Sequence, residues 1–321
     1  MAQPEKAKES SAPAPDDLIH PFQTDNAGAS GRVVRLGAVI DEILGHHDYP
    51  DVVSALLGEA VALAALVGAA LKFDGTFILQ TKTDGPVDML VADYTAPGQL
   101  RGHASFDRAR VDRLEAAAAQ ELLGNGHLAM TIDQGADMER YQGVVPLEGC
   151  DLNAAADIYF RQSVQLDTFL RVAVARHYTA PTNGGAGNWQ WRAGGLMLQN
   201  LTREGGRSGI FADLDAGAGA DGDAEDWNRV RLLAETVEDQ ELVDPMLSSE
   251  RLLYRLFHEE AVRAYTPSAL SFECRCSRDK VKAMLDQFSP SDLREMVEEG
   301  EIRVTCEFCN RQYSFDPSAY G

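Results

Sequence analysis

The chain has 321 residues, and 45% of them are apolar, so it can bury a sizeable core in one large domain with smaller appendages. It carries 50 acidic side chains against 29 Lys and Arg, a formal net charge of −21. This charge repels nucleic acid and anionic membranes at long range, so we expect neither as a partner.

Residues 1–15 are rich in Pro, Ala, Ser and charge, and they lack the apolar segment of a signal peptide. We expect a disordered leader here. Because no secretory signal is present and the cysteines described below are spaced for a metal rather than for a disulfide framework, the reducing cytoplasm is the expected compartment.

The segment 52–71 is apolar except for Ser54, Gly58 and Glu59, and it is long enough to span a bilayer. Against a membrane helix, Glu59 lies within the apolar segment and no positive flank marks a cytoplasmic side. The sequence therefore favours a buried, Ala-rich helix that begins near Asp51.

The following residues mix strand and helix patterns without strict alternation, which predicts an α+β core rather than a doubly wound parallel sheet. Turn residues between short apolar runs predict strands at 73–80, 86–94, 127–133 and 140–147. Composition and apolar spacing predict helices at 110–123 and 153–169. We assign the core domain to residues 16–202.

Composition changes sharply after the core, and we assign residues 203–265 to a linker with seven Arg and fifteen acidic side chains. Its acidic, Gly-rich part, 211–226, predicts a loop or flexible joint. Helices are expected at 227–243 and 248–265, with a break at Asp244-Pro245. Repulsion among its acidic side chains opposes packing of this segment against the core, so we expect a marginally stable linker that packs through the apolar faces of its helices.

Three weaker patterns carry no function. GAGADG at 217–222 matches a dinucleotide fingerprint, but its acidic surroundings would repel a pyrophosphate. His258-Glu259-Glu260 begins like a metalloprotease helix, but Val262 stands where the second His is required. Cys150 has no base near it in the sequence and is expected to be a half-buried bystander. With no P-loop and no nucleophile elbow, we expect no catalytic residues.

The other four cysteines lie in residues 266–321, which we assign to a small C-terminal domain. They form two close pairs, Cys274-Arg275-Cys276 and Cys306-Glu307-Phe308-Cys309, separated by the 29 residues 277–305. Two short loops of this kind supply the four soft donors of a tetrahedral zinc ion. We therefore predict one Zn²⁺ per chain in the reduced form, bound by Cys274, Cys276, Cys306 and Cys309.

This cysteine pattern is compatible with three functions. A static zinc module would only brace a domain for a protein interaction, and a thiol-disulfide oxidoreductase would use Cys274 and Cys276 in catalysis. The third is a redox switch, favoured because a disulfide between Cys274 and Cys276 closes a tight, easily reduced ring. Oxidation would then release zinc, unfold the small domain and loosen the linker, uncovering apolar surface. Pairing is expected to be local, Cys274 with Cys276 and Cys306 with Cys309, because zinc already holds those sulfurs adjacent.

Several motifs together resemble a known family over roughly residues 16–315. The C-terminal motifs are Leu256-Phe257-His258-Glu259, Val262-Arg263, Phe272-Glu273-Cys274-Arg275-Cys276-Ser277, and Gly300 followed by Val304-Thr305-Cys306-Glu307-Phe308-Cys309, Tyr313 and Phe315. Those of the core are Asp84-Gly85-Pro86-Val87 with Met89-Leu90, Arg140-Tyr141-Gln142-Gly143-Val144-Val145, Tyr159-Phe160-Arg161-Gln162-Ser163, and Ala193-Gly194-Gly195-Leu196-Met197-Leu198-Gln199. The family they resemble is the redox-regulated 33 kDa chaperonin, a bacterial heat-shock holdase.

The resemblance implies an α+β core, a helical linker and a zinc domain. It also implies a zinc-bound, inactive reduced form, and an oxidised homodimer that captures unfolding client proteins without ATP and without turnover. Three features depart from the family pattern: the leader, the acidic insert 212–226, and Val164 and Asp167 in Gln162-Ser163-Val164-Gln165-Leu166-Asp167-Thr168, where a carboxylate and a proline are usual. Local packing or dimer contacts at that last site are therefore open.

Overall fold

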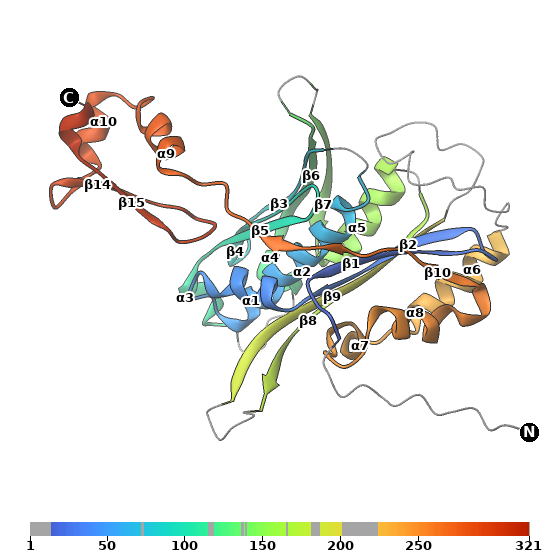
Figure 1. The fold of residues 1–321 in the computed structure, drawn as a ribbon. Coiled ribbons are helices and arrows are strands. Elements are labelled where there is room, and N and C mark those ends of the chain that lie inside the picture. The colour runs from blue at the N-terminus through green and yellow to red at the C-terminus, as the bar shows by residue number, and fades with distance from the viewer. Residues whose placement is uncertain are drawn as a thin grey trace, which may run out of the picture.

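A computed structural model of the chain describes residues 14–320 apart from the gaps 72–73, 115–118, 136–137, 139, 165, 181–186 and 201–223. Two six-stranded sheets enclose a layer of helices, the linker helices cover the outer face of one sheet, and the C-terminal segment projects to one side (Figure 1). The α+β class expected for the core is confirmed.

The first sheet is antiparallel, with the strand order β10-β1-β2-β9-β8 and β11 paired to β1. Its strands are β1 (Leu18–Thr24), β2 (Ala29–Leu36), β8 (Thr168–Thr179), β9 (Asn188–Asn200), β10 (Val262–Ala264) and β11 (Ser268–Ala269). Strand β9 is buried continuously from Arg192 to Asn200, because both faces of the sheet are covered at that level.

The second sheet has the order β12-β5-β4-β3-β6-β7, and of its pairs only β12 with β5 is parallel. Its strands are β3 (Thr76–Thr83), β4 (Val87–Thr95), β5 (Gln99–Phe106), β6 (Asn125–Asp133), β7 (Tyr141–Glu148) and β12 (Ser271–Phe272). Strand β7 alternates buried and exposed residues, as expected for an edge strand with one solvated face. All four strands predicted in this region are confirmed, with shifted ends.

Helix α2 (Asp51–Gly68) lies between the two sheets beside α1 (Ala38–Gly45). By length and composition α2 could cross a membrane, but 78% of it is buried inside the protein. Its apolar side chains pack against β2, β4, β5, β8 and β9 in the main core. The prediction of a buried helix that begins near Asp51 is confirmed.

The two other helices predicted in the core are partly wrong. The segment predicted as 110–123 contains two short helices, α3 (Arg108–Val111) and α4 (Ala119–Leu123), because the chain turns out of the helix at Asp112. The segment 153–169 forms α5 (Leu152–Tyr159) and a π-helical turn (Phe160–Val164), after which Thr168 and Phe169 pair with β9. Pairing with a long neighbouring strand overrides helix propensity there.

The linker contains α6 (Ala224–Glu235), α7 (Asp239–Val243) and α8 (Ser249–Phe257). The break at Asp244-Pro245 is confirmed, but the helix predicted at 248–265 ends at Phe257. A 3-10 turn and Ala261, at φ 50°, follow it, and Val262–Ala264 then pair with β1. Of the loop predicted at 211–226, residues 224–226 begin α6, and the rest lie outside the described residues.

The C-terminal segment contains α9 (Arg278–Leu285), α10 (Pro290–Glu295) and a three-stranded sheet of β13 (Val297–Glu298), β14 (Glu301–Thr305) and β15 (Gln312–Phe315). Its core is small, with five buried apolar residues: Leu285, Leu293, Ile302, Tyr313 and Phe315. Residues 268–272, assigned from sequence to this domain, pair instead with strands of the two large sheets. The rest of the domain division stays a prediction.

Candidate functional site

Four cysteine sulfurs converge where the C-terminal segment meets the core. The Sγ atoms of Cys274, Cys276, Cys306 and Cys309 all lie within 4.8 Å of one another. Cys274 Sγ is 3.6 Å from Cys306 Sγ, and Cys276 Sγ is 3.5 Å from Cys309 Sγ. All four side chains are half-buried and none forms a disulfide. The structure therefore brings together the four residues that the spacing singled out.

Local structure explains how each pair is presented. Cys274 and Cys276 lie between β12 and α9, which begins where the Ser277 hydroxyl accepts a hydrogen bond from the Lys280 amide. Cys306 and Cys309 lie in a tight turn between β14 and β15. The Asn310 amide donates to the Cys306 carbonyl, and Asn310 adopts a left-handed conformation at φ 55°.

The donor set fits a structural zinc ion. Zinc–sulfur bonds of about 2.3 Å in a tetrahedron place the sulfurs about 3.8 Å apart. The two short sulfur–sulfur distances, 3.5 and 3.6 Å, are close to that value. The arrangement can hold a metal ion with only small movements of the loops.

The thiols differ in acidity before any metal binds. Burial and neighbouring thiol groups raise the pKa of Cys274 to about 12, and burial raises the pKa of Cys309. Burial also opposes ionisation of Cys276, but hydrogen bonds from Tyr313 Oη and the other thiols outweigh it and lower its pKa to about 7. The Tyr313 hydroxyl lies 3.2 Å from Cys276 Sγ. Cys276 is therefore the most nucleophilic of these three thiols at neutral pH.

A second feature is the apolar surface that the linker covers. Alternate residues of the first sheet face opposite sides: Val34 and Met197 face α2, whereas Val33 and Leu196 face the linker. On that outer side a cluster joins the sheet to α6, α7 and α8. It consists of Phe22, Ala27, Ala29, Val33, Ala173, Leu196, Leu198, Trp227, Val230, Ala234, Val237, Leu242, Leu252, Leu253, Leu256 and Phe257. We call this cluster the linker interface.

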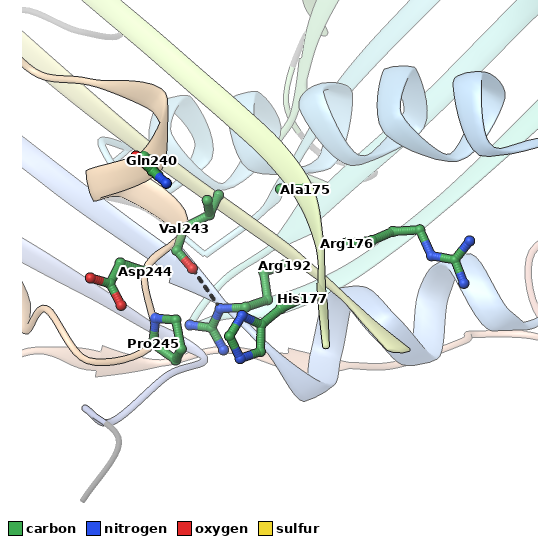
Figure 2. A pocket seen from close by; sticks show the side chains of 8 residues that line it. All are labelled: Ala175, Arg176, His177, Arg192, Gln240, Val243, Asp244 and Pro245. Carbon is green, nitrogen blue, oxygen red and sulfur yellow. Dashed lines mark hydrogen bonds between the residues drawn. The ribbon is translucent and has the colours of Figure 1, made fainter. Parts of the chain in front are cut away.

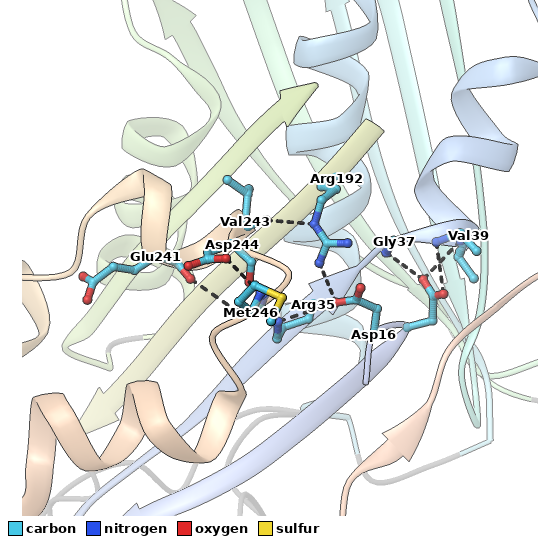
Figure 3. Close-up of polar contacts among 11 residues, drawn as sticks. Asp16, Arg35, Gly37, Val39, Arg192, Glu241, Val243, Asp244 and Met246 are labelled. Atoms are coloured by element: carbon cyan, nitrogen blue, oxygen red, sulfur yellow. Dashed lines mark hydrogen bonds and ion pairs between the residues drawn. The ribbon is translucent and has the colours of Figure 1, made fainter. Parts of the chain in front are cut away.

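Two core arginines hold the end of α7 (Figure 3). Arg192 Nε donates to the Val243 carbonyl at 2.8 Å and its Nη2 to Asp16 at 2.6 Å. Arg35, only 1% exposed, donates to the carbonyls of Glu241 and Asp244. Carbonyls at a helix end lack partners within the helix, so these arginines satisfy them and fix α7 to the sheet. This contact could not be predicted from local sequence patterns, and its one visible signal is a charged Arg35 inside an apolar run.

The seam between α7 and the sheet is not completely filled. A cavity of about 410 Å³ lies between the β8–β9 hairpin and the end of α7 (Figure 2). It is lined by Ala175, Arg176, His177, Arg192, Gln240, Val243, Asp244 and Pro245. This pocket is partly open to solvent at the edge of the linker.

The remaining sequence patterns do not join this site. Cys150 Sγ lies 3.9 Å from the Pro146 carbonyl and packs against the main core. His258 is exposed at the end of α8, with its Nδ1 against the Tyr254 carbonyl. GAGADG at 217–222 lies outside the described residues.

Comparisons with known proteins agree with this arrangement. A sequence model of the family described as Hsp33 protein matches residues 17–316. A 33 kDa chaperonin of Caulobacter vibrioides is 46% identical over 308 residues, which cover 94% of this chain and 95% of that protein. A 33 kDa chaperonin of Nitrosococcus oceani is 38% identical, covering 94% of this chain and 91% of that protein. The crystal structure of the 33 kDa chaperonin of Thermotoga maritima superposes with a TM-score of 0.70 at 20% identity, covering 95% of this chain and 96% of that one, and supports the fold.

Proposed function

Because this chain belongs to the Hsp33 protein family, whose curated relatives are 33 kDa chaperonins, we propose that it is a redox-regulated chaperone that binds unfolding proteins after its thiols are oxidised. The observation that carries the proposal is the convergence of four thiols in a chain whose linker covers a large apolar face of the first sheet.

In the reduced state, Cys274, Cys276, Cys306 and Cys309 would hold one Zn²⁺. The ion would supply the folding energy that the five-residue C-terminal core lacks, since metal binding to four thiolates stabilises such domains by about 10 kcal/mol. With the C-terminal domain folded, the linker stays on the sheet and the linker interface is buried.

An oxidant such as peroxide would convert the thiols to disulfides, which do not bind zinc. We retain the local pairing, Cys274 with Cys276 and Cys306 with Cys309, because it leaves no covalent bond between the two loops. The close sulfur contacts in the structure run between the loops, from Cys274 to Cys306 and from Cys276 to Cys309. Peptide mapping of the oxidised protein distinguishes the two outcomes.

Unfolding of the C-terminal domain after zinc release would loosen the linker and uncover the linker interface. This surface includes Phe22, Leu196 and Leu198 on the sheet and Trp227, Leu252 and Phe257 on the linker, all buried in the reduced form. Contiguous exposed apolar surface of this kind binds unfolded chains without sequence specificity. Because the driving force is apolar burial, binding needs neither ATP nor catalytic turnover. We place this activity in the cytoplasm and in an oxidised homodimer.

The direct test follows aggregation of a thermally unfolding client with reduced protein and with protein treated with peroxide at mild heat. We expect suppression only after oxidation, together with release of one zinc per chain. Equal suppression in both states at full zinc occupancy would refute the switch.

The lowered pKa of Cys276 also suits a thiol-disulfide oxidoreductase, the second candidate. That function predicts turnover of a disulfide substrate without stoichiometric zinc loss. It also predicts that Cys274→Ser abolishes the rate while zinc-dependent folding survives.

A further inference from the structure

In both cysteine pairs, a residue that lies between the two cysteines touches the core. In the first pair, Arg275 Nη2 donates to Asp93 Oδ2 at 2.8 Å, and its Nη1 lies 3.1 Å from Thr76 Oγ1. In the second pair, the Phe308 ring lies 3.9 Å from the guanidinium carbon of Arg101. Arg101 in turn donates to Asp93 Oδ2 at 2.7 Å. Both cysteine pairs therefore reach a single ion pair, Asp93 with Arg101, on β4 and β5.

This ion pair is sensitive to its neighbours. The Asp93 side chain is 3% exposed, and its Oδ1 has no hydrogen-bond partner among the described residues. A buried carboxylate depends on its cations, and losing one of them is costly. The Arg101 side chain is 18% exposed and that of Arg275 36% exposed, so Arg275 is the partner that can move into water at lower cost.

A further contact steadies the second pair. The Glu307 carbonyl lies 2.7 Å from His47 Nε2, just before α2. The His103 ring on β5 lies 6.2 Å from the Phe308 ring. The C-terminal domain thus rests on the core through contacts from both cysteine pairs, and the two sets of contacts form together only while the pairs are held together.

We propose that Asp93 and Arg101 form a docking site that senses whether the two cysteine pairs are joined. This inference rests on the metal site proposed above and adds core residues to the switch. When the pairs are joined, Arg275 and Phe308 bind as a two-part ligand, each raising the effective concentration of the other. When the pairs separate, that advantage is lost and the domain leaves the sheet. By linkage, docking must favour the metal-bound state as much as the metal favours docking.

The test uses the reduced, zinc-loaded full chain and follows zinc release after peroxide with a colorimetric chelator. Asp93→Asn and Arg275→Ala are each expected to release zinc about tenfold faster, because a hydrogen bond between charged groups contributes about that factor. The double variant should release zinc no faster than either single variant, since both changes remove the same contact between Asp93 and Arg275. Asp88→Asn on the same strand and Arg303→Ala in the C-terminal sheet are the matched controls and should release zinc at the wild-type rate.

A second readout is hydrogen exchange at the Glu273 amide, which donates to the Leu100 carbonyl at 3.1 Å. It should exchange faster in both variants while each still binds one zinc per chain. If Asp93→Asn does not fold, Arg275→Ala decides alone, because this side chain lies at the surface of the contact. If both variants bind zinc and release it at the wild-type rate, the docking site is overturned but the metal site is not. A wild-type chain that binds no zinc overturns the metal site, and the docking site with it.

Discussion

Gly194 on β9 lies directly against the carbonyl oxygen of Leu242 in α7. A Cβ built at residue 194 would come within 2.0 Å of that oxygen. The close approach lets the linker helix settle on the sheet beside the Arg192 and Arg35 contacts, and it explains why a residue without a side chain is needed there.

Gly194→Ala is therefore expected to displace α7 while the strand itself remains compatible with alanine. The reduced variant should bind a fluorescent apolar dye and suppress client aggregation without oxidant, because part of the linker interface is uncovered. Gly45→Ala is the control, since its Cβ would meet nothing within 4 Å. A reduced variant with wild-type dye binding would contradict the role of this contact.

Arg192→Ala removes the hydrogen bonds to Val243 and Asp16. We expect weaker docking of α7 by about 1–3 kcal/mol, seen as faster hydrogen exchange in α7 in the reduced, zinc-bound protein. Arg176→Ala is matched to it, because Arg176 lines the same cavity but pairs with Asp51 on the core. Equal exchange in the two variants would show that Arg192 does not hold the linker.

Glu59 predicts an effect of pH on stability. Burial, then the charges of Asp151 and Asp239, raise its pKa to about 7. The unfolded chain ionises this group near pH 4.5, so stability is lost as pH rises from there to about 7. Glu59→Gln should be more stable than wild type at pH 8, by on the order of 3 kcal/mol, and nearly equal to it at pH 4.5. Denaturant unfolding at both pH values, with the exposed Glu148→Gln as control, measures this difference.

Zinc binding should release protons. Because the pKa values of Cys274 and Cys309 are raised in the metal-free protein, both thiols are protonated at neutral pH and must ionise to bind. We expect at least two protons released per ion and an affinity that falls as pH falls. Calorimetry in buffers of different ionisation enthalpy counts the protons, and a count near zero would exclude a four-thiolate site.

The site was more predictable from sequence than the fold around it. Four thiols in two short loops specify a tetrahedral site through local spacing alone, and the structure brings all four together. The strands β1, β2, β5, β8 and β9 were not predicted. In β9 the reason is visible, because this strand is buried continuously from Arg192 and shows no period-two alternation. The helices predicted at 153–169 and 248–265 extend too far for a related reason. Thr168 and Val262, near their predicted ends, pair instead with strands that are distant in sequence.

The contacts that hold the linker and the C-terminal domain to the core were not predicted from the sequence either. Arg35 caps α7 across more than two hundred residues, and Asp93 meets Arg275 across a similar separation. No local pattern marks such pairs, because each forms only after the sheets and helices have assembled.

The short strands β10, β11 and β12 lie along the chain between the linker helices and the cysteines, and each pairs with a strand of the core. Two of them bind β1 through three and two residue pairs, and the third binds β5 through two. If the chain detaches from the core at Cys274, the strands β12, β11 and β10 must separate from their partners in that order before α8 is affected. Detachment that follows brief or partial oxidation of the thiols would then stop at one of these short strands and reverse. Only sustained oxidation would detach all three strands and uncover the buried apolar face.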